Sequence, residues 1–84
     1  MSEKIGKITH YFGKIGVAVL ELSGDLKVGD KIHILGHTTD FEQVVSSMQI
    51  DHKRVEAVGP GDDVALKVAN IVRTGDDVFR VADE

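Results

Sequence analysis

The sequence predicts an all-β fold, namely a small closed barrel of six antiparallel strands. Apolar and polar residues alternate over short segments, glycine stands at nearly every break between them, and no span sustains the 3.6-residue period of a helix. Closure would also remove the exposed edges of so small a sheet. The 84 residues leave room for one core, so we expect a single domain over residues 5–81, with short flexible tails at 1–4 and 82–84.

The first half of the chain marks its strands by composition. The central segment, Val17–Leu22, is rich in β-branched and aliphatic residues, which favour strands. Because side chains alternate, one of its faces is expected in the core and the other outside. The core face carries Ala18, Leu20 and Leu22, and the outer face carries Val17 and Val19. The three strands expected here, separated by a turn at 12–16 and a loop at 23–30, are Ile5–Tyr11, Val17–Leu22 and Lys31–Leu35.

The second half of the chain is expected to supply three more strands. The longest, Phe41–Ile50, carries three apolar residues in one register, Val44, Met48 and Ile50. The following segment, 51–58, stops at a Gly-Pro pair and is too short for a stable helix, so we expect an irregular crossover with one helical turn. The last two strands are Asp63–Ala69, with Val64, Leu66 and Val68 inward, and Val78–Val81.

The pattern Gly-Asp-x-aliphatic marks the corners of the fold. Glycine accepts the positive φ of a tight turn, and aspartate can accept hydrogen bonds from nearby backbone amides where a strand begins. The pattern occurs three times, at Gly29-Asp30, Gly61-Asp62 and Gly75-Asp76. Two further glycines, Gly16 and Gly24, are expected at other structural turns.

Metal binding and catalysis are both disfavoured. Adjacent carboxylates on a strand point to opposite faces, whereas a calcium site needs about six or more oxygens around one centre. His33 and His37 are four residues apart, a spacing that suits a metal on a helix rather than on a strand followed by a turn. Ser46 and Ser47 lie within a strand, without the sharp turn that exposes a nucleophile. We therefore expect no metal, no cofactor and no enzymatic activity.

Composition limits the cellular setting and the partners. The chain has no cysteine, so disulfides and thiolate metal sites are excluded, and no apolar run approaches the roughly 18–20 residues of a membrane helix. We expect a cytoplasmic protein that does not bind membranes. The formal net charge of −4 gives no general attraction for nucleic acid, so any such contact would be local.

Four segments in order resemble one known family. They are Gly16–Ile32, Val45–Met48, Ala57–Leu66 and Gly75–Val78, and together they are similar to domain 2, the β-barrel that follows the G domain in translational GTPases such as elongation factor Tu. The resemblance implies a barrel that contacts the small ribosomal subunit or the acceptor end of tRNA. Similar barrels also occur as appended modules in U32-type peptidases.

The chain lacks the phosphate-binding loop of the GTPases that it resembles. Gly24 and Gly29 have the glycine spacing of that loop, but Asp30 stands where its lysine belongs and Lys31 where its Ser or Thr belongs. The loop also precedes a strand rather than a helix. We expect no GTP binding.

Two surfaces are candidates for binding, and both would make the chain a non-catalytic module. One is the outward pair Val17 and Val19, through which the chain would dock on a larger protein partner such as a U32-type peptidase; the alternative is that a small barrel simply packs both faces of this strand. The other candidate is a set of basic loop residues that would bind RNA, the ribosome or tRNA, or else be a solvated surface: Lys14, His52, Lys53, Arg54 and Arg73. The acidic net charge favours docking on a protein.

Overall fold

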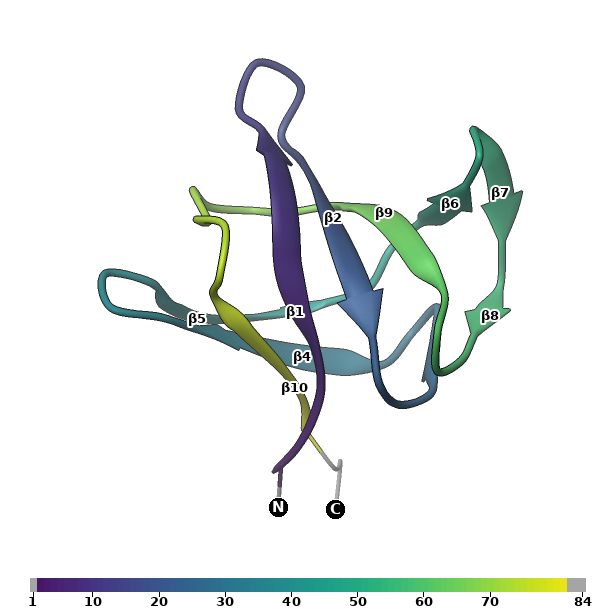
Figure 1. Cartoon of the computed structure of the whole chain (residues 1–84), viewed down its shortest axis with the longest axis horizontal. Helices are drawn as coiled ribbons and strands as arrows, with labels where there is room; N and C mark the ends of the chain where they lie inside the picture. Colours follow the sequence, from purple (N-terminus) through teal and green to yellow (C-terminus); the bar gives the residue numbers. More distant parts are fainter. Residues whose placement is uncertain (1, 82–84) are drawn as a thin grey trace.

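The computed structural model describes residues 2–81, and the chain is all-β over this range, as predicted. No helix occurs among these residues. Two of the predicted strands have the predicted bounds, Val17–Leu22 and Lys31–Leu35. The ten strands, labelled in Figure 1, are β1 (Ser2–Phe12), β2 (Val17–Leu22), β3 (Leu26–Lys27), β4 (Lys31–Leu35), β5 (Asp40–Val44), β6 (Met48–Ile50), β7 (Lys53–Val55), β8 (Ala57–Val58), β9 (Asp63–Lys67) and β10 (Asp77–Val81).

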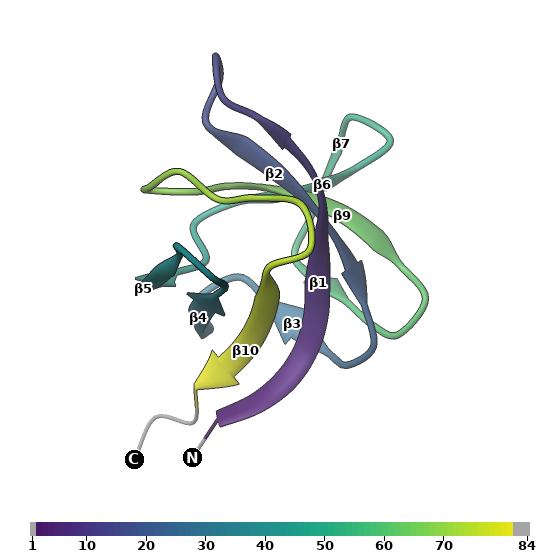
Figure 2. The same cartoon turned by 60° about the vertical axis from the view of Figure 1, so that its left-hand side comes forward.

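Eight strands form one antiparallel sheet in the order β5-β4-β10-β1-β2-β9-β6-β7, and β3 pairs with β8 separately. The sheet curls around the core, and the β1–β2 hairpin projects beyond it in both views (Figures 1 and 2). Its two edge strands, β5 and β7, do not pair with each other within the described residues, so a closed six-stranded barrel is not confirmed. The first and last described residues, Ser2 and Val81, are paired neighbours on β1 and β10.

A glutamine side chain links the edge strand β5 to the end of β9 and the residues just after it. The Gln43 side-chain amide Nε2 donates to the Lys67 carbonyl at 2.8 Å, and the Ala69 amide donates to Gln43 Oε1 at 2.7 Å. Two hydrogen bonds from one side chain thus take the place of a backbone ladder between these segments.

The core is filled by the inward faces of the strands, as the alternation predicted. Side chains directly opposite on paired strands share a face, and one inward row crosses β2, β9 and β6 through Ala18, Leu66 and Met48. The buried apolar residues are Ile5, Ile8, Ala18, Leu20, Leu22, Leu26, Ile32, Ile34, Val45, Met48, Val64, Leu66, Val68, Val72 and Val78.

Several predicted boundaries are wrong. Residues 2–4 belong to β1 rather than to a tail, while residues 1 and 82–84, also expected in tails, lie outside the described residues. The segment 51–58 contains β7 and β8 and no helical turn. The expected strand 41–50 is broken into β5 and β6, so that Val45 is buried while Val44 is 56% exposed.

The bend after β5 has a backbone cause. The Val45 amide donates to the Asp30 carbonyl at 2.8 Å, and the Gly29 amide donates to the Val45 carbonyl at 2.9 Å. These bonds hold Val45 against the turn before β4, so the chain leaves the register of β5 there.

The three Gly-Asp turns share one geometry. Gly29, Gly61 and Gly75 have φ values of 99°, 88° and 97°, in the region that favours glycine. In each turn the aspartate amide donates to the carbonyl three residues earlier, and its carboxylate accepts the amide of that same earlier residue. The carboxylate bonds are Asp30 Oδ2 to the Lys27 amide (3.1 Å), Asp62 Oδ2 to the Gly59 amide (2.9 Å) and Asp76 Oδ2 to the Arg73 amide (2.9 Å).

Two other glycines are fixed by their surroundings. Gly16 has a φ of 66° in the β1–β2 turn. Gly24 has no such backbone requirement, but a Cβ built there would lie 3.0 Å from the Ile5 side chain. Residues 2–81 contain no helix of the length and apolarity needed to cross a membrane.

Candidate interaction surfaces

The outward face of β1, β2, β9 and β6 carries an apolar strip. Its central row crosses the four strands through His10, Val19, Ala65 and Gln49, which are opposite one another in the strand register, so that the apolar Val19 and Ala65 lie between two exposed polar residues. The next row begins with Phe12 and Val17, at the end of the β1–β2 hairpin. The strip forms one wall of a shallow groove of 360 Å³.

The hairpin end of this groove exposes large apolar side chains. Phe12 is 50% exposed and Ile15 is 65% exposed, and both line the groove beside the half-buried Val17 and Val19. The His10 ring stacks on Phe12, with ring centroids 6.3 Å apart and planes 7° from parallel. Large exposed apolar groups gathered at one place are typical of an interaction surface.

The opposite end of the groove is formed by the β6–β7 hairpin. Its two turn residues, Asp51 and His52, have φ values of 49° and 66°, and neither is glycine. Two successive positive φ values match the type I′ turn of tight hairpins, which suits the twist of the strands. Both residues line the groove together with Val19, so the turn contributes its polar border.

The structure brings only part of the predicted site together. Val17, Val19 and His52 line one groove, although they were assigned to two competing surfaces. The other predicted residues are exposed and lie outside this groove: Lys14 in the β1–β2 turn, Lys53 and Arg54 on β7, and Arg73 between β9 and β10. The basic residues therefore come from three separate hairpins and connections rather than from one strand or turn.

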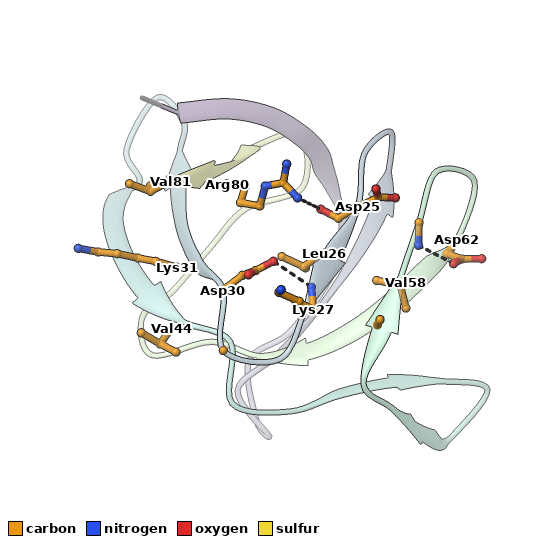
Figure 3. A pocket seen from close by; sticks show the side chains of 13 residues that line it. Asp25, Leu26, Lys27, Asp30, Lys31, Val44, Val58, Asp62, Arg80 and Val81 are labelled. Atoms are coloured by element: carbon orange, nitrogen blue, oxygen red, sulfur yellow. Dashed lines mark hydrogen bonds between the residues drawn. The ribbon is translucent and has the colours of Figure 1, made fainter. Parts of the chain in front are cut away.

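A second, larger hollow of 1070 Å³ lies where β3 and β8 meet the end of β10 (Figure 3). Leu26 lies at its centre in the view, with Val44 and Val58 to either side. Arg80 reaches across to Asp25, whose main-chain carbonyl accepts a hydrogen bond from the guanidinium at 3.1 Å. This hollow was not predicted.

A signal for the hollow was nonetheless present in the sequence. Alternation along β10 places Arg80 on the same face as Val78, which is fully buried. The residue opposite Arg80 on β4 is Ile32, which is also fully buried. An arginine at an inward position indicates that the core opens at this end of the sheet, since a charged group would otherwise be buried.

Groups that could perform chemistry are scattered. Within residues 2–81, no three histidine or carboxylate side chains are grouped as a metal site would require. His33 Nε2 contacts Asp40 Oδ1 at 2.5 Å on the outer face of β4 and β5, and Lys31 Nζ contacts Glu42 Oε1 at 3.3 Å nearby. Each contact is accounted for as a cross-strand pair at the surface.

No family model matches the chain. It is 47% identical over 77 residues to an uncharacterized protease of Methanocaldococcus jannaschii, which covers 90% of this chain and 19% of that protein. It is 36% identical over 78 residues to a collagenase of Porphyromonas gingivalis, which covers 90% of this chain and 22% of the collagenase. The chain thus spans about one fifth of the length of these curated relatives.

Solved structures show the same fold. The C-terminal domain of a protein assigned as a U32 peptidase in Geobacillus thermoleovorans superposes with a TM-score of 0.90 at 19% identity, over 95% of this chain and 93% of that domain. A selenomethionine variant of that domain superposes with a TM-score of 0.86 at 20% identity, over 90% of this chain and 96% of that domain. At this level of identity the match defines the fold alone.

The predicted resemblance to domain 2 of translational GTPases is wrong, and so is the function in translation drawn from it. The relatives and the structural neighbours are proteases and a peptidase domain. The residues that suggested the resemblance are mainly the Gly-Asp corners, which set the backbone of turns. Such corners occur wherever short strands must be connected tightly, so they cannot distinguish one family from another.

Proposed function

We propose that this chain is a non-catalytic module of a U32-type peptidase and that it docks on the catalytic domain. The observation that supports this most directly is the match to about one fifth of two proteins named as proteases, together with the fold of a peptidase C-terminal domain. In those relatives, about four fifths of the chain lies outside the matched part and would hold the catalytic groups.

The groove on the outward face is the proposed docking surface. Val17 and Val19 are half-buried on this face, and Phe12 and Ile15 extend the apolar strip to the hairpin tip. A catalytic domain seated there would remove these side chains from water, at about 25 cal/mol for each Å² of apolar surface buried. The charged residues at the border of the groove would stay in the solvent-accessible rim of the interface, where they remain hydrated.

A chimera of the Porphyromonas gingivalis collagenase can test the proposal. Replacing its matching 78 residues with this chain should retain hydrolysis of gelatin, whereas deleting them should reduce it. Gelatin is chosen because the relative is named a collagenase. A chimera no more active than the deletion would contradict the proposal, as would gelatin hydrolysis by this chain alone.

Substitutions within the chimera identify the docking surface. Val19→Asp should lower activity tenfold or more, because an unpaired carboxylate in an apolar contact costs more than the roughly 1.4 kcal/mol that corresponds to a factor of ten. The matched control is Lys53→Ala with Arg54→Ala, which changes two exposed residues outside the groove and should leave activity unchanged. Equal activities in the two chimeras would exclude the groove as the docking surface.

A further inference from the structure

One end of the outward groove is acidic. It is lined by Asp51 and His52 in the β6–β7 turn and by Asp63 at the start of β9, and no lysine or arginine of residues 2–81 lines the groove. Both aspartates are exposed, and within the described residues neither carboxylate has an ion pair or a hydrogen bond. The groove therefore presents two carboxylates that the chain itself leaves free.

Asp63 also faces a like charge. It lies directly opposite Glu21 on β2, and alternation places both side chains on the outward face with Val19. Like charges directly opposite each other destabilise an antiparallel pair. Lys7 lies opposite Glu21 on the other side, but it contacts neither carboxylate within 4 Å. The sheet thus keeps, beside its apolar strip, a carboxylate pair that lowers the stability of the isolated chain.

The carboxylates on the other part of the sheet are engaged instead. On β10 and β5, Asp77, Glu42 and Asp40 each contact a basic side chain of the neighbouring strand, at 3.1, 3.3 and 2.5 Å. Charges that are paired within the chain have little left to offer a partner. The free carboxylates of the groove, in contrast, can each accept hydrogen bonds from a partner's cation.

We propose that the groove receives a basic segment of the peptidase catalytic domain, with apolar side chains against Val19 and a lysine or arginine against Asp51 and Asp63. This pairing depends on the docking proposed above and adds the chemistry of the partner. Two cations that adjoin the groove in the strand register, Arg54 and Lys67, lie outside its lining. Complementary charges of this kind fix the register of an interface and exclude wrong partners.

Asp63→Lys is a sharp test because it should move stability and docking in opposite directions. In the isolated chain it replaces a like-charge pair with an opposite-charge pair, so the Tm should rise by about 1–8 °C. In the collagenase chimera the new ammonium group would face the partner's cation, so gelatin hydrolysis should fall about tenfold at low ionic strength. The ratio between parent and variant should shrink in about 0.5 M salt, which screens exposed charges.

The matched control is Glu56→Lys. It makes the same charge change at an exposed glutamate that lines neither the groove nor the hollow, and it should leave gelatin hydrolysis unchanged. Asp51→Asn is a second, milder test, because asparagine tolerates the φ of 49° at this turn. Removing that one carboxylate should lower hydrolysis about two- to fivefold.

Val19→Asp separates the basic segment from docking itself. If Val19→Asp lowers hydrolysis while Asp63→Lys and Asp51→Asn match the control, the catalytic domain docks in the groove without a cation there, and only the basic segment is refuted. If Val19→Asp is silent as well, both docking in the groove and the basic segment are refuted. A lower Tm for Asp63→Lys would also overturn the proposal, because the carboxylate would then serve the fold.

Discussion

Replacing Gln43 with alanine should destabilise the fold although the residue is only half-buried. The change removes the hydrogen bonds to the Lys67 carbonyl and from the Ala69 amide, at 2.8 and 2.7 Å. A hydrogen bond contributes about 0.5–1.5 kcal/mol net. Water can reach the freed backbone groups, so we expect a loss of about 1–2 kcal/mol, which lowers the Tm of a domain of this size by about 4–16 °C.

Two measurements check this prediction. Thermal unfolding gives the stability, and amide hydrogen exchange at Ala69 reports the lost bond directly, because that amide then lacks its acceptor. Gln49→Ala is the matched control, since it removes an exposed glutamine side chain that also lies on a strand. If Gln43→Ala has the same Tm as the control and Ala69 exchanges as slowly as in the parent, the glutamine does not hold β5 to the end of β9.

Two further stability predictions concern the core and a turn. Leu20→Ala should cost about 2–5 kcal/mol, because Leu20 is fully buried, and urea unfolding that coincides with the parent would refute the inward register. Gly61→Ala should cost about 1–2 kcal/mol, because φ is 88° there and only backbone strain is added, no atom lying within 4 Å of the new Cβ. Gly13→Ala, at a turn glycine without positive φ, should cost clearly less in the same denaturant assay.

The strands that alternation predicts best are those with a polar residue between each pair of apolar ones. In Lys31–Leu35, Ile32 and Ile34 are separated by His33, so the inward face could be assigned without ambiguity. Two adjacent valines, Val44 and Val45, give no such indication. The choice of Val45 for the core depends on its backbone bonds to the turn at Gly29 and Asp30, about 15 residues earlier, and such long-range bonds leave no local pattern.

The candidate surfaces were predictable to different degrees. The outward direction of Val17 and Val19 follows from the period of two, but their proximity to His52 depends on the pairing of β2 with β9 and of β9 with β6. Arg80 could have been recognised as inward from its spacing to Val78. The pairing of β3 with β8 near this arginine could not be predicted from the sequence, because each of these strands is only two residues long.

The pairing of Ser2 with Val81 has a consequence for how such a unit combines with other proteins. Because these two residues are neighbours, a polypeptide that enters the unit at one of them and leaves it at the other does both at one place on the surface (Figure 1). A unit with adjacent ends can be added to one terminus of a host or inserted into one of its loops without separating the host's own segments.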